Sequence, residues 1–232
     1  MLTLRPAAQR GHADHGWLDT HHTFSFASYD DPRHRGFRSL RVINEDRVAG
    51  GRGFGTHGHS DMEILSLVLE GQLEHSDSMD NGAVLEVGEV QYMSAGSGVR
   101  HSEFNPHPER PVRFYQVWIE PAANERGATP RYGQIQLDLT APGEQPVAGD
   151  DAEIALRQDA AVRYVNVPAG EAHEVVGRRP HQWVQVLEGS GRIEGSQTLE
   201  VAASDGVAAV DEGSLVLHAG EQPLTALVFD LA

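Results

Sequence analysis

Cysteine is absent from all 232 residues of the chain. Its absence excludes disulfide bonds, thiolate nucleophiles, cysteine-based zinc sites and iron–sulfur clusters. It does not identify the compartment, because cytosolic and secreted proteins can both lack cysteine. Any chemistry that the protein performs must therefore use other side chains.

Long apolar segments are also missing. No stretch approaches the roughly 18 uninterrupted apolar residues that predict a membrane-spanning helix. Residues 1–6 do not have the apolar core of a secretory signal. We therefore expect no membrane partner and a cytoplasmic location.

Positive charge is scarce. The chain has 18 lysines and arginines against 34 aspartates and glutamates, which gives a formal net charge of −16. An acidic surface repels the phosphate backbone of DNA and RNA, so we expect no direct nucleic-acid partner. The same surface leaves a protein partner possible.

Helical periodicity is not visible in the first 120 residues. Apolar β-formers instead occur in short runs, such as residues 64–69 and 113–119, and an Asn-Gly turn signal falls within residues 79–82. Residues 23–27 alternate and predict a short strand with both phenylalanine rings in the core. The sequence predicts an all-β fold.

Two tandem domains are predicted, over residues 1–140 and 141–232. Pro, Gly and polar residues are concentrated in residues 140–150, as expected for a domain boundary. The tetrapeptide Val-Leu-Glu-Gly occurs at residues 68–71 and again at 186–189, which suggests an internal duplication.

Two pairs of potential metal ligands occur in i, i+2 register. His57 and His59 precede the apolar run at residues 64–69, and His101 and Glu103 follow about forty residues later. Alternate side chains of a strand point to the same face and lie roughly 6.5 Å apart. If the two pairs lie on adjacent strands, they form a pocket of three histidines and one carboxylate.

The other histidines do not show this pairing. The duplication places Val175 and Gly177 opposite His57 and His59, so we expect the second domain to be a copy without metal. The histidines of residues 12–22 have irregular spacings, and we interpret them as structural.

The carboxylate ligand could be Glu63 or Glu103. Glu63 follows His59 by four residues, about 13 Å along an extended strand, and would reach the metal only if the chain turned. Glu103 shares a face with His101 and needs no turn. We therefore favour Glu103 and assign Glu63 a possible role in holding a ligand histidine.

The motifs resemble those of the cupins. Gly51-x5-His57-x-His59-x3-Glu63 is similar to the first cupin motif. Gly98-x2-His101-x3-Asn105 is similar to the second, although Gly96 replaces the usual proline. The chain resembles the pirin family in particular, over four stretches at residues 10–18, 22–27, 53–59 and 93–103.

The resemblance implies a bicupin, that is, two tandem cupin β-sandwiches with a metal in the N-terminal half alone. It also implies Glu103 as the fourth ligand and the activity of a bacterial quercetin 2,3-dioxygenase. Three imidazoles and a carboxylate suit one divalent transition metal ion per chain, with iron expected first and nickel, copper, manganese, cobalt or zinc as alternatives.

Three functions are then open. The first is a dioxygenase that opens the C-ring of a flavonol with O2 and releases carbon monoxide, with Glu103 as ligand and base. The second is a metal-dependent regulatory protein that senses redox state and acts through a protein partner. The third is another cupin reaction, such as an isomerisation. Oxygen uptake with quercetin separates the first from the other two.

Overall fold

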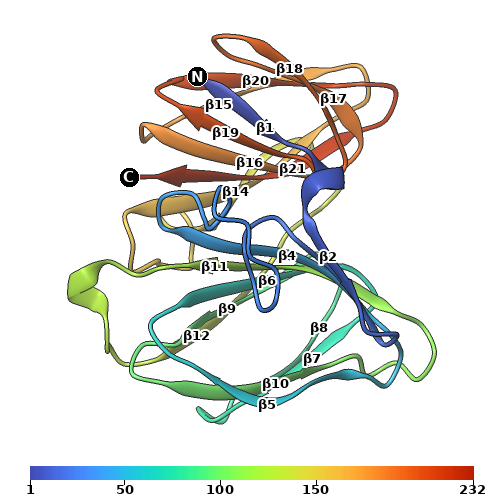
Figure 1. Cartoon of the computed structure of the whole chain (residues 1–232), viewed down its shortest axis with the longest axis vertical. Helices are drawn as coiled ribbons and strands as arrows, with labels where there is room; N and C mark the ends of the chain where they lie inside the picture. The colour runs from blue at the N-terminus through green and yellow to red at the C-terminus, as the bar shows by residue number, and fades with distance from the viewer. The chain divides into compact units, whose positions relative to one another are not determined.

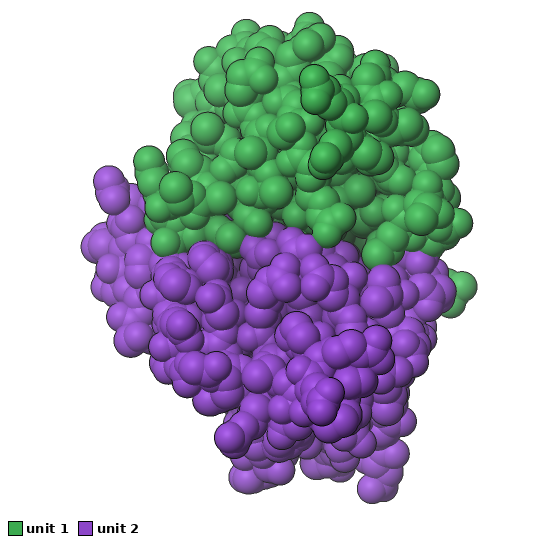
Figure 2. All heavy atoms as spheres, turned by 90° about the vertical axis from the view of Figure 1, so that its right-hand side faces the viewer, with its two compact units in different colours: residues 1–10, 138–232 green, residues 11–137 purple.

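A computed structural model describes all 232 residues, and the chain forms two compact units (Figure 2). One unit contains residues 11–137, and the other contains residues 1–10 and 138–232. Apart from two short 3-10 helices, η1 (Ala7–Gln9) and η2 (Ala123–Glu125), the regular structure consists of strands. The predicted all-β class is confirmed. None of the helices has the length and apolar character needed to cross a membrane.

The unit of residues 11–137 contains two antiparallel sheets (Figure 1). The seven-stranded sheet has the order β12-β9-β6-β11-β4-β3-β2, and the four-stranded sheet has the order β5-β10-β7-β8. The strands of the larger sheet are β2 (Gly11–Asp14), β3 (Leu18–His22), β4 (Leu40–Val48), β6 (Glu63–Glu70), β9 (Glu89–Ser94), β11 (Val112–Ile119) and β12 (Arg131–Gln136). Those of the smaller sheet are β5 (Gly53–His59), β7 (Leu73–Asp77), β8 (Gly82–Leu85) and β10 (Val99–Phe104).

Apolar side chains from both sheets form one core in this unit. Val48 and Phe114 come from the larger sheet, and Leu73 and Leu85 come from the smaller. All four are at most 1% exposed. The two sheets therefore pack face to face as a sandwich, as alternating strands with one apolar face require.

The second unit is also a two-sheet sandwich. Its sheets have the orders β1-β19-β16-β21-β14-β13 and β15-β20-β17-β18. The strands of the first sheet are β1 (Leu2–Arg5), β13 (Gly143–Ala148), β14 (Ala160–Val167), β16 (His181–Glu188), β19 (Gly206–Val210) and β21 (Leu224–Leu231). Those of the second are β15 (Ala172–Val176), β17 (Ser190–Glu194), β18 (Thr198–Ala202) and β20 (Ser214–Ala219). The expected pair of sandwiches is present.

The boundaries of the compact units differ from the sequence-based domains in two places. Strand β1 belongs to the second unit, because it pairs with β19 and Leu2 packs into that unit's core at 3% exposure. Residues 140–150, expected to mark the domain boundary, contain the edge strand β13 of the second unit. Pro146 is tolerated there because an edge strand has an unpaired side.

The aromatic segment at residues 23–27 does not form a strand, so this prediction was wrong. The strand ends at His22, and the chain then turns, with Phe26 and Tyr29 forming an isolated bridge. Phe24 is 2% exposed and lies in the interior, as expected. Phe26 instead lies partly exposed against the edge of Trp118, with ring centroids 5.5 Å apart.

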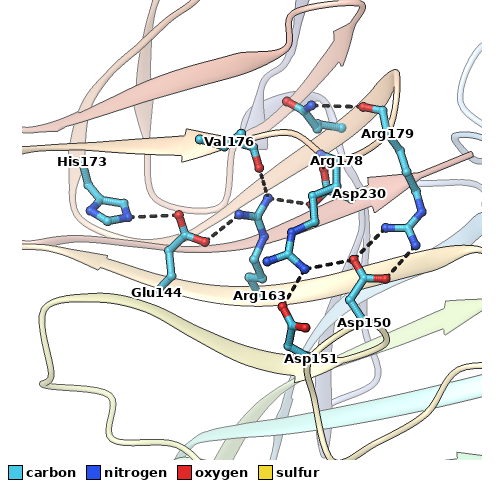
Figure 3. Close-up of polar contacts among 10 residues, drawn as sticks. Glu144, Asp150, Asp151, Arg163, His173, Val176, Arg178, Arg179 and Asp230 are labelled. Carbon is cyan, nitrogen blue, oxygen red and sulfur yellow. Dashed lines mark hydrogen bonds and ion pairs between the residues drawn. The ribbon is translucent and has the colours of Figure 1, made fainter.

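Charged side chains join the strands of the second unit (Figure 3). Arg163 of β14 donates to Glu144 of β13 and to Asp230 of β21, both at 2.6 Å. Arg179 donates to both carboxylate oxygens of Asp150, at 2.8 and 3.0 Å. The hydrogen bonds from Arg179 hold the pKa of Asp150 below its usual value. These contacts tie the edge strand to the sheet, and the loop that follows it to the segment before β16.

Candidate metal centre

Three neighbouring strands of the four-stranded sheet supply the polar cluster. Strand β10 lies between β5 and β7, with His101 opposite His57 on one side and Asp77 on the other. Two residues along β10, Glu103 lies opposite His75. Because alternate residues share a face, the sheet presents six side chains on one surface: His57, His59, His75, Asp77, His101 and Glu103.

The three predicted histidine ligands converge. One ring nitrogen from each of His57, His59 and His101 lies within 4.8 Å of the others. The ring centroids of His57 and His59 are 4.5 and 4.9 Å from that of His101. Glu103 forms a second group of three potential ligands with His75 and His101, whose ligand atoms also lie within 4.8 Å of one another. The two groups therefore share His101, and the complete four-ligand set stays a prediction.

Gly53 allows the close approach of β5 to β10 beside this cluster. A Cβ atom at position 53 would lie 2.2 Å from the backbone oxygen of Glu103. The register of the two strands shifts between His101 and Glu103, which marks a β-bulge. Bulges redirect side chains next to functional sites, and here the shift lies between the two predicted ligands of β10.

The hydrogen-bond partners fix the tautomers of the rings. His57 Nδ1 lies 2.9 Å from the carbonyl oxygen of Gly55, so Nδ1 is the donor and Nε2 keeps its lone pair. His75 Nε2 lies 3.2 Å from Asp77 Oδ2, and its Nδ1 lies 3.4 Å from Nδ1 of His101. Since the carboxylate accepts from Nε2, His75 accepts at Nδ1 from His101. Nε2 of His101 therefore also has a lone pair.

These two lone pairs face each other, with Nε2 of His57 and Nε2 of His101 only 3.1 Å apart. Burial, followed by the neighbouring His57, lowers the pKa of His59 to about 4. Burial, followed by the surrounding histidines, lowers the pKa of His101 to about 3. Neutral imidazoles with converging lone pairs fit a transition metal ion, which would satisfy them together.

The two candidate carboxylates have different surroundings. Glu103, 1% exposed, accepts hydrogen bonds from Ser66 Oγ at 3.3 Å and Gln116 Nε2 at 2.9 Å. Burial raises its pKa to about 7, against the opposing effect of Gln116. Glu63 lies on the other sheet, where Tyr92 and Ser94 each donate to it at 2.6 Å. Glu63 belongs to neither histidine group.

A cavity of about 520 Å³ lies beside the cluster, lined in part by His57, His59 and Glu103. This volume is typical of a small-molecule site. Both aromatic and polar side chains line it. Trp118 packs edge-on against His59, with ring centroids 4.9 Å apart, and Trp17 and Phe26 also line the cavity. A flat aromatic ligand could therefore contact both the walls and the predicted metal ligands.

Several residues of the site were not predicted. His75 and Asp77 follow the same i, i+2 pattern as the predicted pairs, so the sequence did contain a signal for them. Gln116, which bonds Glu103, and Asp46, which lines the cavity, lie within buried strands of the opposite sheet. Nothing in their local sequence distinguishes them from structural residues.

The N-terminal histidines include a group that spacing did not reveal. His12 and His21 are cross-strand partners on β2 and β3, and their rings stack with centroids 4.4 Å apart. Nε2 of His12 and Nδ1 of His21 each lie within 3.4 Å of Asp19 Oδ1. All three side chains are at least one-third exposed, so water can satisfy them. That this segment holds no metal stays a prediction.

The corresponding face of the second unit is apolar. Val175, Ile193, Leu215 and Leu217 project from its four-stranded sheet into the core. His173 and His218 lie outside this core, where Glu144 and Glu194 each bond one of them at 3.1 Å. No group of three potential ligands occurs in this unit. The apolar filling supports the expectation of a single metal per chain.

Comparison with known families and proteins gives matches in both units. Residues 3–119 match the family described as Pirin, and residues 146–231 match the Quercetinase C-terminal cupin domain.

Individual proteins match over nearly the whole chain. A quercetin 2,3-dioxygenase of Escherichia coli is 45% identical, covering 100% of this chain and 99% of that protein. A pirin-like protein of Caulobacter vibrioides is 37% identical, covering 98% and 99%. The crystal structure of the bacterial pirin YhhW from E. coli in complex with nickel(II) aligns with a TM-score of 0.92 at 44% identity, covering 100% and 99%.

Proposed function

The chain belongs to the pirin family of cupins, and on this basis we propose that it is a metal-dependent dioxygenase. Its substrate would be a flavonol such as quercetin, whose C-ring is opened with O2 and loses carbon monoxide. The observation that carries the proposal is the convergence of three imidazoles beside a buried carboxyl group, with His57, His59 and Glu103 lining a cavity that also has aromatic walls. The full-length similarity to a protein named quercetin 2,3-dioxygenase supports the substrate class.

His57, His59 and His101 would hold one divalent transition metal ion, with Glu103 as the fourth ligand. When bound, the ion would supply positive charge that lowers the pKa of an attached substrate oxygen, and a site for reaction with O2. Iron is the metal we expect first. The relative crystallised with nickel(II) shows that a related pirin accepts another metal.

The side chains would position the flavonol and move its proton. Trp17, Phe26 and Trp118 offer flat apolar surfaces to the rings. The 3-hydroxyl would point toward the histidines, close to the Glu103 carboxylate that would take its proton. Gln116 holds one oxygen of Glu103 at 2.9 Å, which leaves the carboxylate with a fixed orientation. The base role rests on this position beside the histidines.

Oxygen consumption with quercetin tests the proposal. Protein stripped of metal and then reloaded should consume O2 and release carbon monoxide in equal amounts. Protein without metal, and His101→Ala under the same conditions, should do neither. If reloaded protein with bound quercetin consumes no O2 with any of the six candidate metals, the dioxygenase proposal is wrong.

The alternative is a metal-dependent regulatory protein that acts through a protein partner. Two observations favour keeping it: the net charge of −16, which suits a basic protein partner, and a relative named only as pirin-like. Capture of the same partner by metal-loaded protein, and its loss on metal removal, would support this function. A cytoplasmic location fits both functions and remains a prediction.

A further inference from the structure

Asp46 lies on β4, in the sheet opposite the histidines, and lines the cavity. Asp46 is only 4% exposed. Thr20, on the neighbouring strand, hydrogen-bonds the carboxyl group. The other oxygen, Oδ1, is buried and has no hydrogen-bond partner. A buried acceptor without a partner is uncommon in folded proteins and calls for an explanation.

The other carboxyl and amide groups of the cavity are already engaged. Asn44 Oδ1 accepts a hydrogen bond from Nδ1 of His22 at 2.8 Å. Gln116 donates to Glu103 and accepts from the Trp118 indole at 3.1 Å. Among these groups, Asp46 alone keeps a buried oxygen without a partner. Asp46 can therefore accept one further hydrogen bond without breaking an existing contact.

This acceptor also complements the rest of the cavity. Aromatic walls bind a flat ring but discriminate little between ring substituents, whereas a polar group fixes orientation and specificity. Burial raises the pKa of Asp46 to about 7, which shows how poorly its surroundings solvate the charge. In either protonation state, a carboxyl group can accept a hydrogen bond from a hydroxyl.

We propose that Asp46 determines substrate specificity by accepting a hydrogen bond from a second hydroxyl of a polyhydroxylated flavonol. This hydroxyl is distinct from the 3-hydroxyl, which faces the histidines on the opposite sheet. The ligand is thus held at a second polar point, on β4, in addition to the histidines. The inference rests on the proposed function for the class of substrate, but it concerns binding and not turnover.

Calorimetric titration of the nickel-loaded protein under nitrogen tests the proposal, since binding is then measured without reaction. The two ligands are quercetin and 3-hydroxyflavone, which carries only the 3-hydroxyl. Asp46→Leu should weaken quercetin binding about 10- to 100-fold, the effect of a hydrogen bond to a carboxyl group. Its affinity for 3-hydroxyflavone should not fall. Asp46→Asn keeps an acceptor oxygen and should retain most of the preference.

Glu45→Gln is the matched control, because Glu45 precedes Asp46 on β4 and points to the other face, where it pairs with Arg113 at 2.9 Å. It should bind both ligands as the wild type does. If Asp46→Leu does not fold, Asp46→Ala removes the same acceptor. An unchanged quercetin preference in these variants, or an equal loss for both ligands, would overturn the proposal.

The reaction is measured separately. If the protein binds quercetin through Asp46 but never consumes O2, the specificity role of Asp46 stands and the dioxygenase proposal is wrong. If Asp46→Leu opens quercetin with unchanged selectivity, the dioxygenase proposal stands and the role of Asp46 is wrong.

Discussion

The Nδ1 atoms of His75 and His101 lie 3.4 Å apart, and Asp77 Oδ2 lies 3.2 Å from the far nitrogen of His75. These two contacts orient His101 with its Nε2 lone pair toward His57. Both His75 and His101 are 1% exposed, so water does not compete for these positions. The geometry of the predicted metal ligand therefore depends on two residues that would not themselves bind the metal.

Replacing His75 by Phe should weaken metal binding about 10- to 100-fold, which is typical when a partner of a ligand histidine is lost. Phe preserves the ring volume but cannot accept the proton of His101. Competition with a chelator of known affinity measures the change. Glu74→Gln is the control, because Glu74 is an exposed residue on the other face of β7. Equal metal affinity in the two variants would show that His75 does not orient His101.

Glu103→Gln should impair turnover more than metal content. The change keeps one acceptor oxygen but removes the charge and the basicity of the carboxylate. With metal restored by excess in the buffer, quercetin cleavage should fall by roughly 10²- to 10⁴-fold, the usual contribution of a general base. Steady-state O2 uptake and elemental analysis measure the two quantities.

Glu63→Gln is the comparison, and its effect should be smaller, on the order of 10- to 100-fold. Glu63 is held by Tyr92 and Ser94 on the opposite sheet. Loss of metal from Glu63→Gln, together with near wild-type behaviour of Glu103→Gln, would show that Glu63 is the ligand.

Elemental analysis should give one tightly bound metal per chain. Replacing His12 or His15 by Ala should leave that content unchanged, since the side chains of His12, Asp19 and His21 are at least one-third exposed. Replacing His59 by Ala should lower it. A second equivalent of metal that disappears with His12→Ala would locate another site on the β2–β3 hairpin.

Asp46 should make stability depend on pH. Its pKa is about 7 in the folded protein, against 3.8 for an ordinary aspartate. Between these values, the unfolded chain has released a proton that the folded protein keeps, so stability falls as the pH rises. Asp46→Asn should remove this effect and be more stable than the wild type at pH 7, by on the order of a few kcal/mol.

Urea unfolding of metal-free protein at pH 4 and pH 7 measures the difference. The advantage of Asp46→Asn should be small at the lower pH and large at the higher. The same advantage at both values would mean that Asp46 does not titrate in this range.

The sequence predicted the features that depend on local patterns. Alternating apolar residues indicated the strands, and the i, i+2 spacing placed His57 with His59 and His101 with Glu103. Which strands lie side by side, and which sheet faces them, could not be predicted from local patterns. The contact of His75 with His101 depends on which strand lies beside β10, and the presence of Asp46 in the cavity depends on how two sheets face each other. The i, i+2 spacing marks His75 and Asp77 as a pair but does not say which strand lies beside them, and Asp46 has no such signal.

Strand β1 has a consequence for how the chain reaches its native state. Its residues are synthesised long before their partner β19, and the backbone of Met1 pairs with that of Val210, 209 positions later. Until β19 has been synthesised, Leu2 and Leu4 cannot pair with it and pack into the core of their unit. A fragment of residues 138–232 would conversely leave the outer edge of β19 without a neighbour. Such an open edge is a template for strand addition by another molecule, and a peptide of residues 1–10 supplied in trans would be the occupant that fits it.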